Sequence, residues 1–180
     1  KNKDTVKKYI QIRKKVLKIK DYATYDEKAS NLNFRINLKD AMNQINDAFS
    51  YFENDANVIV KKLVKDKNIN ITTKTETYLP YVGYSYQLGV TDPWVFIWYQ
   101  NKLDSAMTTA HELGHAIHQH KLMEHNNFWN ADTSLIIHET VSFTHEMMYL
   151  LNLYYSSRHK TTKKKILHQI LKYYYDVIYL

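Results

Sequence analysis

The sequence predicts a mainly α-helical protein that carries a small β-hairpin or sheet. Only three Gly and two Pro occur in 180 residues, too few for the many tight turns of an all-β protein. Most of the chain places apolar residues at helical spacing, whereas residues 69–99 are rich in β-branched and aromatic types and contain both Pro residues. Within that stretch, residues 81–88 and 94–99 are predicted to be strands, joined as a hairpin through residues 89–93.

Amphipathic periodicity predicts three helices before the strands. Apolar residues at i, i+3 and i+4 mark a helix that packs one face on a core. The clearest stripe follows Asn37, whose short polar side chain suits an N-cap; it consists of Leu38, Ala41, Met42, Ile45, Ala48, Phe49 and Phe52. The other two predicted helices span residues 6–20, capped by Asp4 or Thr5, and residues 55–65.

Three more helices are predicted after the strands. The first runs from about residue 102 to residue 121, with Asn101 as N-cap and Asp104 in the capping-box position. Its buried stripe is Leu103, Ala106, Met107, Ala110 and Leu113. An Asn-rich loop at residues 123–131 leads to a helix that carries Glu139 and is capped by Asp132 or Thr133, and a final helix starts at Thr161 or Thr162.

The first of these later helices contains His111-Glu112-Leu113-Gly114-His115, which is a His-Glu-x-x-His motif. Positions i and i+4 lie on one helix face, so His111 and His115 can both turn an imidazole nitrogen to one metal ion. Zinc accepts imidazole at roughly 2.0–2.1 Å and keeps a fourth position for water when it has three protein ligands. Glu112 lies close enough to act as a general base on that water. The motif therefore predicts a zinc site and requires a third ligand.

Glu139 is the leading candidate for the third ligand. It follows His115 at a distance that leaves room for a loop and a second, antiparallel helix, and a carboxylate there completes a His2Glu site. Gly114 leaves a gap in side-chain volume where another segment can approach the motif closely. The spacing by itself leaves His138, His145 and Glu146 as alternatives.

Several motifs, in this order along the chain, resemble the core of oligoendopeptidase F, in the thimet-oligopeptidase group of zinc metallopeptidases. They are Asp92 to Tyr99, Leu103-Asp104-Ser105, His111 to Ala116 with His118, and Glu139 to Glu146. The resemblance implies a helical, zincin-like metallopeptidase core with its sheet beside the His-Glu-x-x-His helix. It also implies hydrolysis of peptide bonds in short oligopeptides, one Zn²⁺ per chain held by His111, His115 and Glu139, and Glu112 as general base. The family usually has Ala and Asn where Val141 and His145 stand here, and these changes leave the metal-site residues untouched.

The resemblance also bears on how much of an active site the chain contains. In the family, the donors that stabilise the oxyanion are a His and a Tyr from a segment beyond the third-ligand helix. Nothing after Glu146 matches that pattern, since the tyrosines at 173–175 lack the accompanying Gly and His. We therefore expect residues 1–180 to be a single helical unit, part of a larger catalytic domain, that binds zinc but by itself cleaves short peptides poorly or not at all.

Other histidines and polar residues near the motif have less specific roles. His118 is predicted to be a hydrogen-bonded cleft residue rather than a ligand, while His120, His125, His159 and His168 are predicted to lie at the surface. Metal-bound imidazoles usually donate their second N–H to an outer partner, for which Asp104, Thr108 or Glu146 is suited. The strand edge beside the metal helix either pairs with a substrate peptide or merely covers the helices.

Composition and charge limit the remaining possibilities. The net charge of +7 arises largely from Lys-rich segments at 1–20 and 163–165. These lysines lie opposite apolar positions, as on solvated helix faces, so we expect no nucleic-acid surface. With no Cys, no apolar run near ~20 residues and no signal-peptide pattern, we expect a cytoplasmic protein without disulfides or membrane contact, whose partners are short peptides. No oligomeric state is indicated.

Two alternatives to a peptidase remain open. One is a catalytically inactive or truncated zinc-binding helical fragment, and the other is a basic helical binding module. A third class, a carboxylate-bridged di-metal bundle, would need Glu-x-x-His twice. Residues 112–115 supply one copy, but residues 139–142 end in Ser, which excludes this class.

Overall fold

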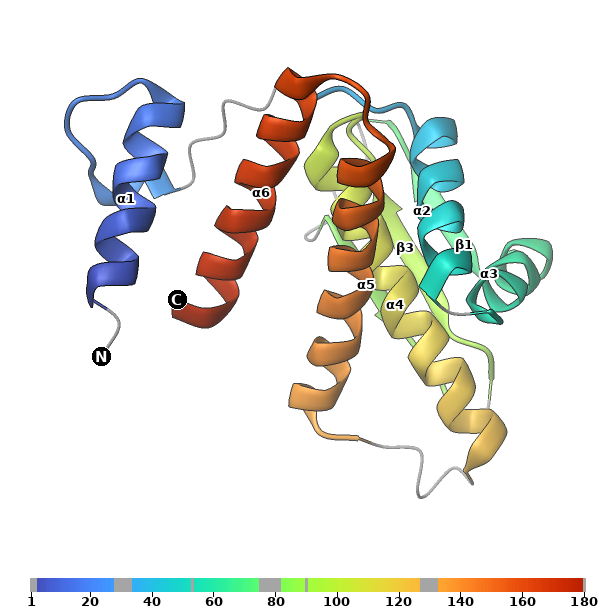
Figure 1. Ribbon diagram of the computed structural model, residues 1–180. Coiled ribbons are helices and arrows are strands. Elements are labelled where there is room, and N and C mark those ends of the chain that lie inside the picture. The colour runs from blue at the N-terminus through green and yellow to red at the C-terminus, as the bar shows by residue number, and fades with distance from the viewer. Residues whose placement is uncertain are drawn as a thin grey trace. The chain divides into compact units, whose positions relative to one another are not determined.

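The computed structural model describes residues 3–27, 34–52, 54–74, 82–89, 91–126 and 133–179 (Figure 1). These ranges contain six α-helices, one 3-10 turn and a three-stranded sheet, which confirms the predicted mainly helical fold with a small sheet. The elements are α1 (Lys3–Leu17), η1 (Thr24–Glu27), α2 (Leu38–Phe52), α3 (Ala56–Lys65), β1 (Ile69–Thr72), β2 (Gly83–Tyr86), β3 (Trp94–Trp98), α4 (Leu103–His125), α5 (Leu135–Ser156) and α6 (Lys160–Tyr179).

Contacts divide the chain into two compact units. One consists of Lys1–Asn33 and Tyr154–Leu180, and the other of Phe34–Leu153. The larger unit contains the whole sheet and the His-Glu-x-x-His helix. That the chain acts as a single unit within a larger catalytic domain stays a prediction. Among the described helices, none is long and apolar enough to cross a membrane.

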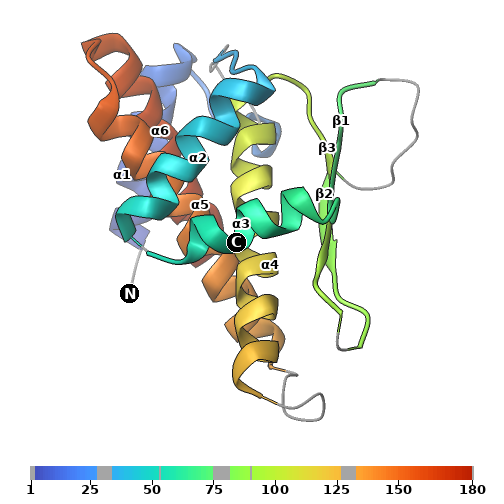
Figure 2. The ribbon, with the colours of Figure 1, turned by 90° about the vertical axis from the view of Figure 1, so that its right-hand side faces the viewer.

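The sheet of the larger unit has the strand order β1-β3-β2. Strand β2 runs antiparallel to β3, as the predicted hairpin requires, with Tyr84 opposite Phe96. Strand β1 pairs with β3 in parallel and was not predicted. Side chains alternate across β3, so that Val95 and Ile97 are fully buried on the face that α4 covers (Figure 2).

Helix α4 differs from its prediction at both ends. It begins at Leu103 after Lys102, which is extended and provides no side-chain cap. Asn101 has a positive φ of 55° and is therefore not the N-cap. At the other end, α4 continues to His125, two residues beyond the start of the predicted loop. The five predicted buried residues of this helix are all buried.

The other predicted helix starts have mixed outcomes. Asn37 is confirmed as a cap, because its Oδ1 accepts a hydrogen bond from the Asp40 amide at 2.8 Å. The prediction that Asp4 or Thr5 caps the first helix is wrong, since both residues lie inside α1. Helix α5 begins after Ser134, whose carbonyl accepts its first amide bonds, so Thr133 is one residue too early, and Asp132 lies outside the described ranges. Helix α6 starts at Lys160, just ahead of the predicted threonines.

The smaller unit pairs α1 with α6. The rings of Tyr9 and Tyr175 stack with centroids 3.9 Å apart. Arg13 is fully buried and donates a 2.6 Å hydrogen bond to the Asp26 carbonyl. His168 on α6 is only 6% exposed, so its predicted surface position is wrong. His168 is two residues from Ile166 and from Ile170, so helical periodicity places it on another side of α6 than these two, and its burial shows that this side is covered as well.

Candidate metal centre

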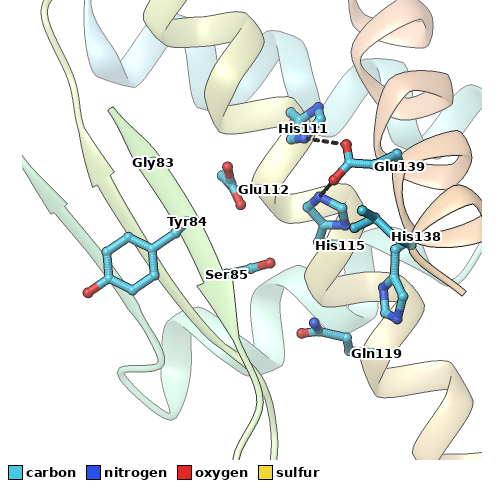
Figure 3. Close-up of a pocket in the computed structure, with 10 residues that line it drawn as sticks. Gly83, Tyr84, Ser85, His111, Glu112, His115, Gln119, His138 and Glu139 are labelled. Atoms are coloured by element: carbon cyan, nitrogen blue, oxygen red, sulfur yellow. Dashed lines mark ion pairs between the residues drawn. The ribbon is translucent and has the colours of Figure 1, made fainter. Parts of the chain in front are cut away.

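Three predicted ligands come together between α4 and α5. His111 Nε2 lies 3.5 Å from Glu139 Oε2, and His115 Nε2 lies 3.6 Å from Glu139 Oε1. One donor atom from each residue can be chosen so that all three lie within 4.8 Å of one another. Figure 3 shows the carboxylate of Glu139 reaching from α5 to both imidazoles on α4. One metal ion therefore has room to contact all three side chains.

The alternative third ligands point elsewhere. The His138 ring turns away from the Glu139 carboxylate in Figure 3. His145 Nδ1 lies 2.8 Å from the Val141 carbonyl one helical turn earlier. Glu146 contacts the other ring nitrogen of His111, with Oε2 at 3.3 Å from Nδ1. Of these carboxylates and imidazoles, Glu139 is the one that faces both Nε2 atoms.

Glu146 lies where an outer partner of a metal-bound histidine is expected. Its side chain is 10% exposed, and its contact with His111 Nδ1 leaves Nε2 directed at Glu139. Such a carboxylate fixes the tautomer and orientation of the ring. The two other partners predicted for this role lie elsewhere. Asp104 is exposed, and the Thr108 side chain borders Gly83 of β2.

The two histidines differ in their electrostatic surroundings. Burial, and next the charge of His111, lower the pKa of His115 to about 4, so this imidazole is neutral at pH 7. Burial also acts to lower the pKa of His111, but the hydrogen bond and charge of Glu146 outweigh it and raise that pKa. Neutral imidazole nitrogens and a carboxylate are a donor set that zinc accepts. The chemistry of these residues thus fits the predicted metal.

Glu112 points from α4 towards β2, on the opposite side of the cavity from Glu139 (Figure 3). It is 7% exposed. Burial raises the pKa of its carboxyl group, although hydrogen bonds from the Ser85 hydroxyl and amide partly offset this rise. The strand comes this close only because residue 83 is Gly: a Cβ there would lie 2.8 Å from Thr108 Cγ2 and 3.0 Å from Glu112 Cγ.

A second close approach fixes α5 against α4. A Cβ on Gly114 would lie 2.9 Å from Cβ and 3.0 Å from Cγ of His145. The gap predicted at Gly114 is therefore confirmed, and His145 fills it. Because Glu139 and Glu146 stand on the same helix as His145, this contact sets how near their carboxylates come to His111.

A cavity of about 320 Å³ connects these groups. It opens between β2, α4 and α5, and β2 is an edge strand of the described sheet. The residues that line it are Gly83, Tyr84, Ser85, His111, Glu112, His115, Gln119, Leu135, His138 and Glu139. Its floor therefore carries the metal-site residues and one wall carries strand backbone.

The remaining histidines only partly follow the sequence predictions. His125 and His159 are exposed, as predicted. His120 is not a surface residue: it is 9% exposed, and its Nδ1 lies 2.7 Å from Asp92 Oδ1. Asp92 is the first residue of the Asp92–Tyr99 motif that resembles oligoendopeptidase F. This motif was the one sequence signal that could have pointed to a structural role for Asp92 and its partner His120. For His118, Nδ1 is buried without a hydrogen-bond partner in the described structure.

Relatives in sequence cover most of the chain. Chromosomal oligoendopeptidase F of Lactococcus lactis subsp. cremoris is 28% identical over 142 residues, which are 77% of this chain and 23% of that protein. Oligopeptidase PepF of Bacillus subtilis (strain 168) is 22% identical over 152 residues, 81% of this chain and 22% of that protein. The chain is similar to oligoendopeptidase F. The resemblance predicted from the motifs is thereby confirmed, and the chain spans less than a quarter of these relatives. No protein-family model matches it.

Solved structures share the fold. A candidate peptidase from Chlamydophila abortus superposes with a TM-score of 0.82 at 22% identity, over 99% of this chain and 30% of that chain. A candidate oligoendopeptidase F from Bacillus anthracis str. Ames superposes with a TM-score of 0.72 at 13% identity, over 94% of this chain and 31% of that chain. These similarities confirm the predicted fold class.

Proposed function

We propose that the chain carries the zinc site of an oligopeptidase, which hydrolyses peptide bonds in short oligopeptides. The observation that carries this proposal is the convergence of His111, His115 and Glu139 within 4.8 Å, from two helices, at a cavity that Glu112 also lines. The names of the relatives, oligoendopeptidase and oligopeptidase, support peptides as the substrate class.

Each residue has a distinct role in this proposal. Bound zinc would polarise the scissile carbonyl and lower the pKa of a water molecule, which becomes the nucleophile when it loses a proton. Glu112 is the general base that accepts the proton of this water and passes it to the leaving amine. His111, His115 and Glu139 are the ligands. Glu146 orients the His111 ring and does not touch substrate.

The edge of β2 offers a place for the substrate main chain. The Val82 carbonyl accepts a hydrogen bond from the Trp98 amide, so the backbone groups of Val82, Tyr84 and Tyr86 point towards β3. By the alternation of a strand, those of Gly83 and Ser85 point away from β3. The Ser85 amide already donates to Glu112, so a peptide that adds as a further strand would bond to the Gly83 amide and to the Gly83 and Ser85 carbonyls, whatever its side chains. This favours the substrate-pairing alternative for the strand edge over a merely covering role.

Metal analysis of the purified chain and its variants tests the ligand set. We expect one tightly bound Zn²⁺ per chain, and Glu139→Ala should lower zinc affinity by more than the roughly 10–100-fold that loss of an outer partner costs. Glu124→Ala, an exposed carboxylate on α4, is the matched control and should bind zinc normally. If Glu139→Ala kept full affinity while Glu146→Ala or His118→Ala lost it, the third ligand would be misassigned.

A further inference from the structure

A second pair of histidines lies beside the candidate zinc ligands. His118 is on α4 and His138 is on α5, and their ring centroids are 5.0 Å apart with an interplanar angle of 68°. The proposed zinc ligands His111 and His115 have nearly the same arrangement, with centroids 4.8 Å apart and an angle of 85°. The two pairs therefore match in spacing and in the tilt of their rings.

This spacing is the one expected for two imidazoles on one metal ion. With a metal–nitrogen distance of roughly 2.0–2.1 Å and a tetrahedral angle between the ligands, two ring centres lie about 5 Å apart. The buried histidines of the larger unit, unlike the half-buried His118 and His138, are held by other contacts. His145 bonds to the Val141 carbonyl, and His120 bonds to Asp92. The His118–His138 pair has the ring spacing of a ligand pair, and no such contact accounts for it among the described residues.

Nearby polar atoms also lack partners. His118 Nδ1 and Gln119 Oε1 are both buried without a hydrogen bond in the part of the chain that the structure describes. His138 and Gln119 line the cavity, and in Figure 3 the His138 ring is directed along α4 towards the turn that carries Gln119. A bound cation with its water molecules would offer these imidazole and amide groups the partners that the described residues do not provide.

We propose that His118 and His138 form a second, weaker transition-metal site, with the Gln119 carbonyl oxygen as third donor. Among the described residues the site has no carboxylate, and the His138 ring centroid is only 6.1 Å from that of His115, so a cation in the first site repels a cation in the second. Imidazole donors favour Cu²⁺ over Zn²⁺. Excess metal then places a second cation on the wall of the substrate cavity, where it hinders peptide entry.

Metal counting on the 180-residue chain tests the site without reference to catalysis. Equilibrium dialysis against increasing free Zn²⁺, and separately Cu²⁺, should give one equivalent first and a second at about tenfold or more higher free metal. The double variant His118→Gln/His138→Gln should keep the first equivalent and lose the second. The control His125→Gln/His159→Gln removes two exposed histidines and should keep both.

Two results would overturn the proposal: saturation of the parent chain at one equivalent, or an unchanged second equivalent in the double variant. The retained first equivalent reports that the double variant is folded. If the double variant loses both equivalents, the single variant His138→Gln is measured instead. It should weaken binding of the second equivalent only. Unchanged binding of the second equivalent in this variant would reject the site. Failure of this site leaves the Glu139→Ala test of the zinc ligands unaffected.

Discussion

Helices α4 and α5 contribute to the candidate site in different ways. Helix α4 supplies His111, Glu112 and His115 within five consecutive residues, so helix geometry alone places both imidazoles on one face. Helix α5 supplies Glu139 close to an exposed end, where Leu135 and Ile136 are 73% and 78% exposed. One half of the site is therefore local in sequence, whereas the other depends on how α5 packs against α4.

Because of this difference, substitutions on the two helices should affect different properties: catalysis in one case and metal affinity in the other. In the proposed site, changes at Glu112 should alter the chemistry and leave the ligand positions intact. Changes on α5 should alter how tightly a metal is held, because Glu139 and Glu146 reach His111 across the helix interface. Four substitutions, from the largest expected effect to the smallest, probe this division.

Glu112→Gln should abolish hydrolysis while keeping zinc. An amide cannot accept the proton of the attacking water, and general-base catalysis contributes roughly 10²- to 10⁴-fold to rate. Because the parent chain is expected to turn over slowly, its chelator-sensitive turnover of a fluorogenic peptide is measured first as the reference. Turnover and zinc content of the variant are then measured in one sample, so that retained zinc serves as the folding control. Near-normal turnover in this variant would reject Glu112 as the base.

Glu146→Gln should weaken zinc binding without preventing it. The amide still occupies the space beside His111 Nδ1 but no longer presents a negative charge to the imidazole, and loss of such an outer partner typically costs roughly 10–100-fold in metal affinity. A competition titration with a chromophoric chelator measures the change. Glu124→Gln removes an exposed charge from α4 and should have no effect. Equal affinities in the two variants would show that Glu146 does not orient the ligand.

Gly114→Ala should destabilise the fold, although Ala is normally the better helix residue by about 1 kcal/mol. The new methyl group would lie 2.9 Å from His145 Cβ, which is anchored to the backbone of α5 and cannot rotate away. Overpacking of this kind costs about 1–3 kcal/mol, and it should also lower zinc affinity by displacing Glu139. Urea unfolding measures the stability, with Thr144→Ala at an exposed position of α5 as control. An increase in stability would contradict the observed helix contact.

The sequence predicted the local parts of this structure best. Residue spacing alone identified the helix with His111 and His115, the Asn37 cap and the pairing of β2 with β3, because each depends on neighbours in sequence. It favoured Glu139 without excluding His138 or Glu146. That choice depends on which carboxylate faces the Nε2 atoms across two helices, a tertiary property that spacing does not contain.

The predictions that failed also concern features that depend on contacts between residues far apart in the sequence or on the local backbone conformation. Strand β1 is only four residues long and pairs in parallel with β3, so no turn signal links the two. Asn101 has the composition of an N-cap but adopts a left-handed conformation, which Asn tolerates better than most residues. His120 and His168 are polar residues on amphipathic helices, and only the folded structure shows that both are buried.

The smallest expected effect concerns the contact that ties α4 to the loop before β3. Asp92 accepts hydrogen bonds from Lys62 of α3 and from His120 of α4. Burial raises the pKa of Asp92, but these hydrogen bonds outweigh it and hold the pKa below its ordinary value. Asp92→Asn should destabilise the fold by about 1 kcal/mol or less, since the groups are partly exposed.

The pH dependence distinguishes this ion pair from simple packing. A carboxyl group whose pKa is lower in the folded than in the unfolded state stabilises the fold above its unfolded pKa of about 4, and this stabilisation is lost as pH falls through the folded pKa. The stability difference between the parent chain and Asp92→Asn should therefore be full at pH 7 and shrink at about pH 3. Urea unfolding at both pH values measures it. Asp66→Asn, which removes the exposed 3.6 Å partner of Lys62, should change stability little at either pH. A difference for Asp92→Asn that persists unchanged in acid would show that shape, rather than charge, holds the loop to α4.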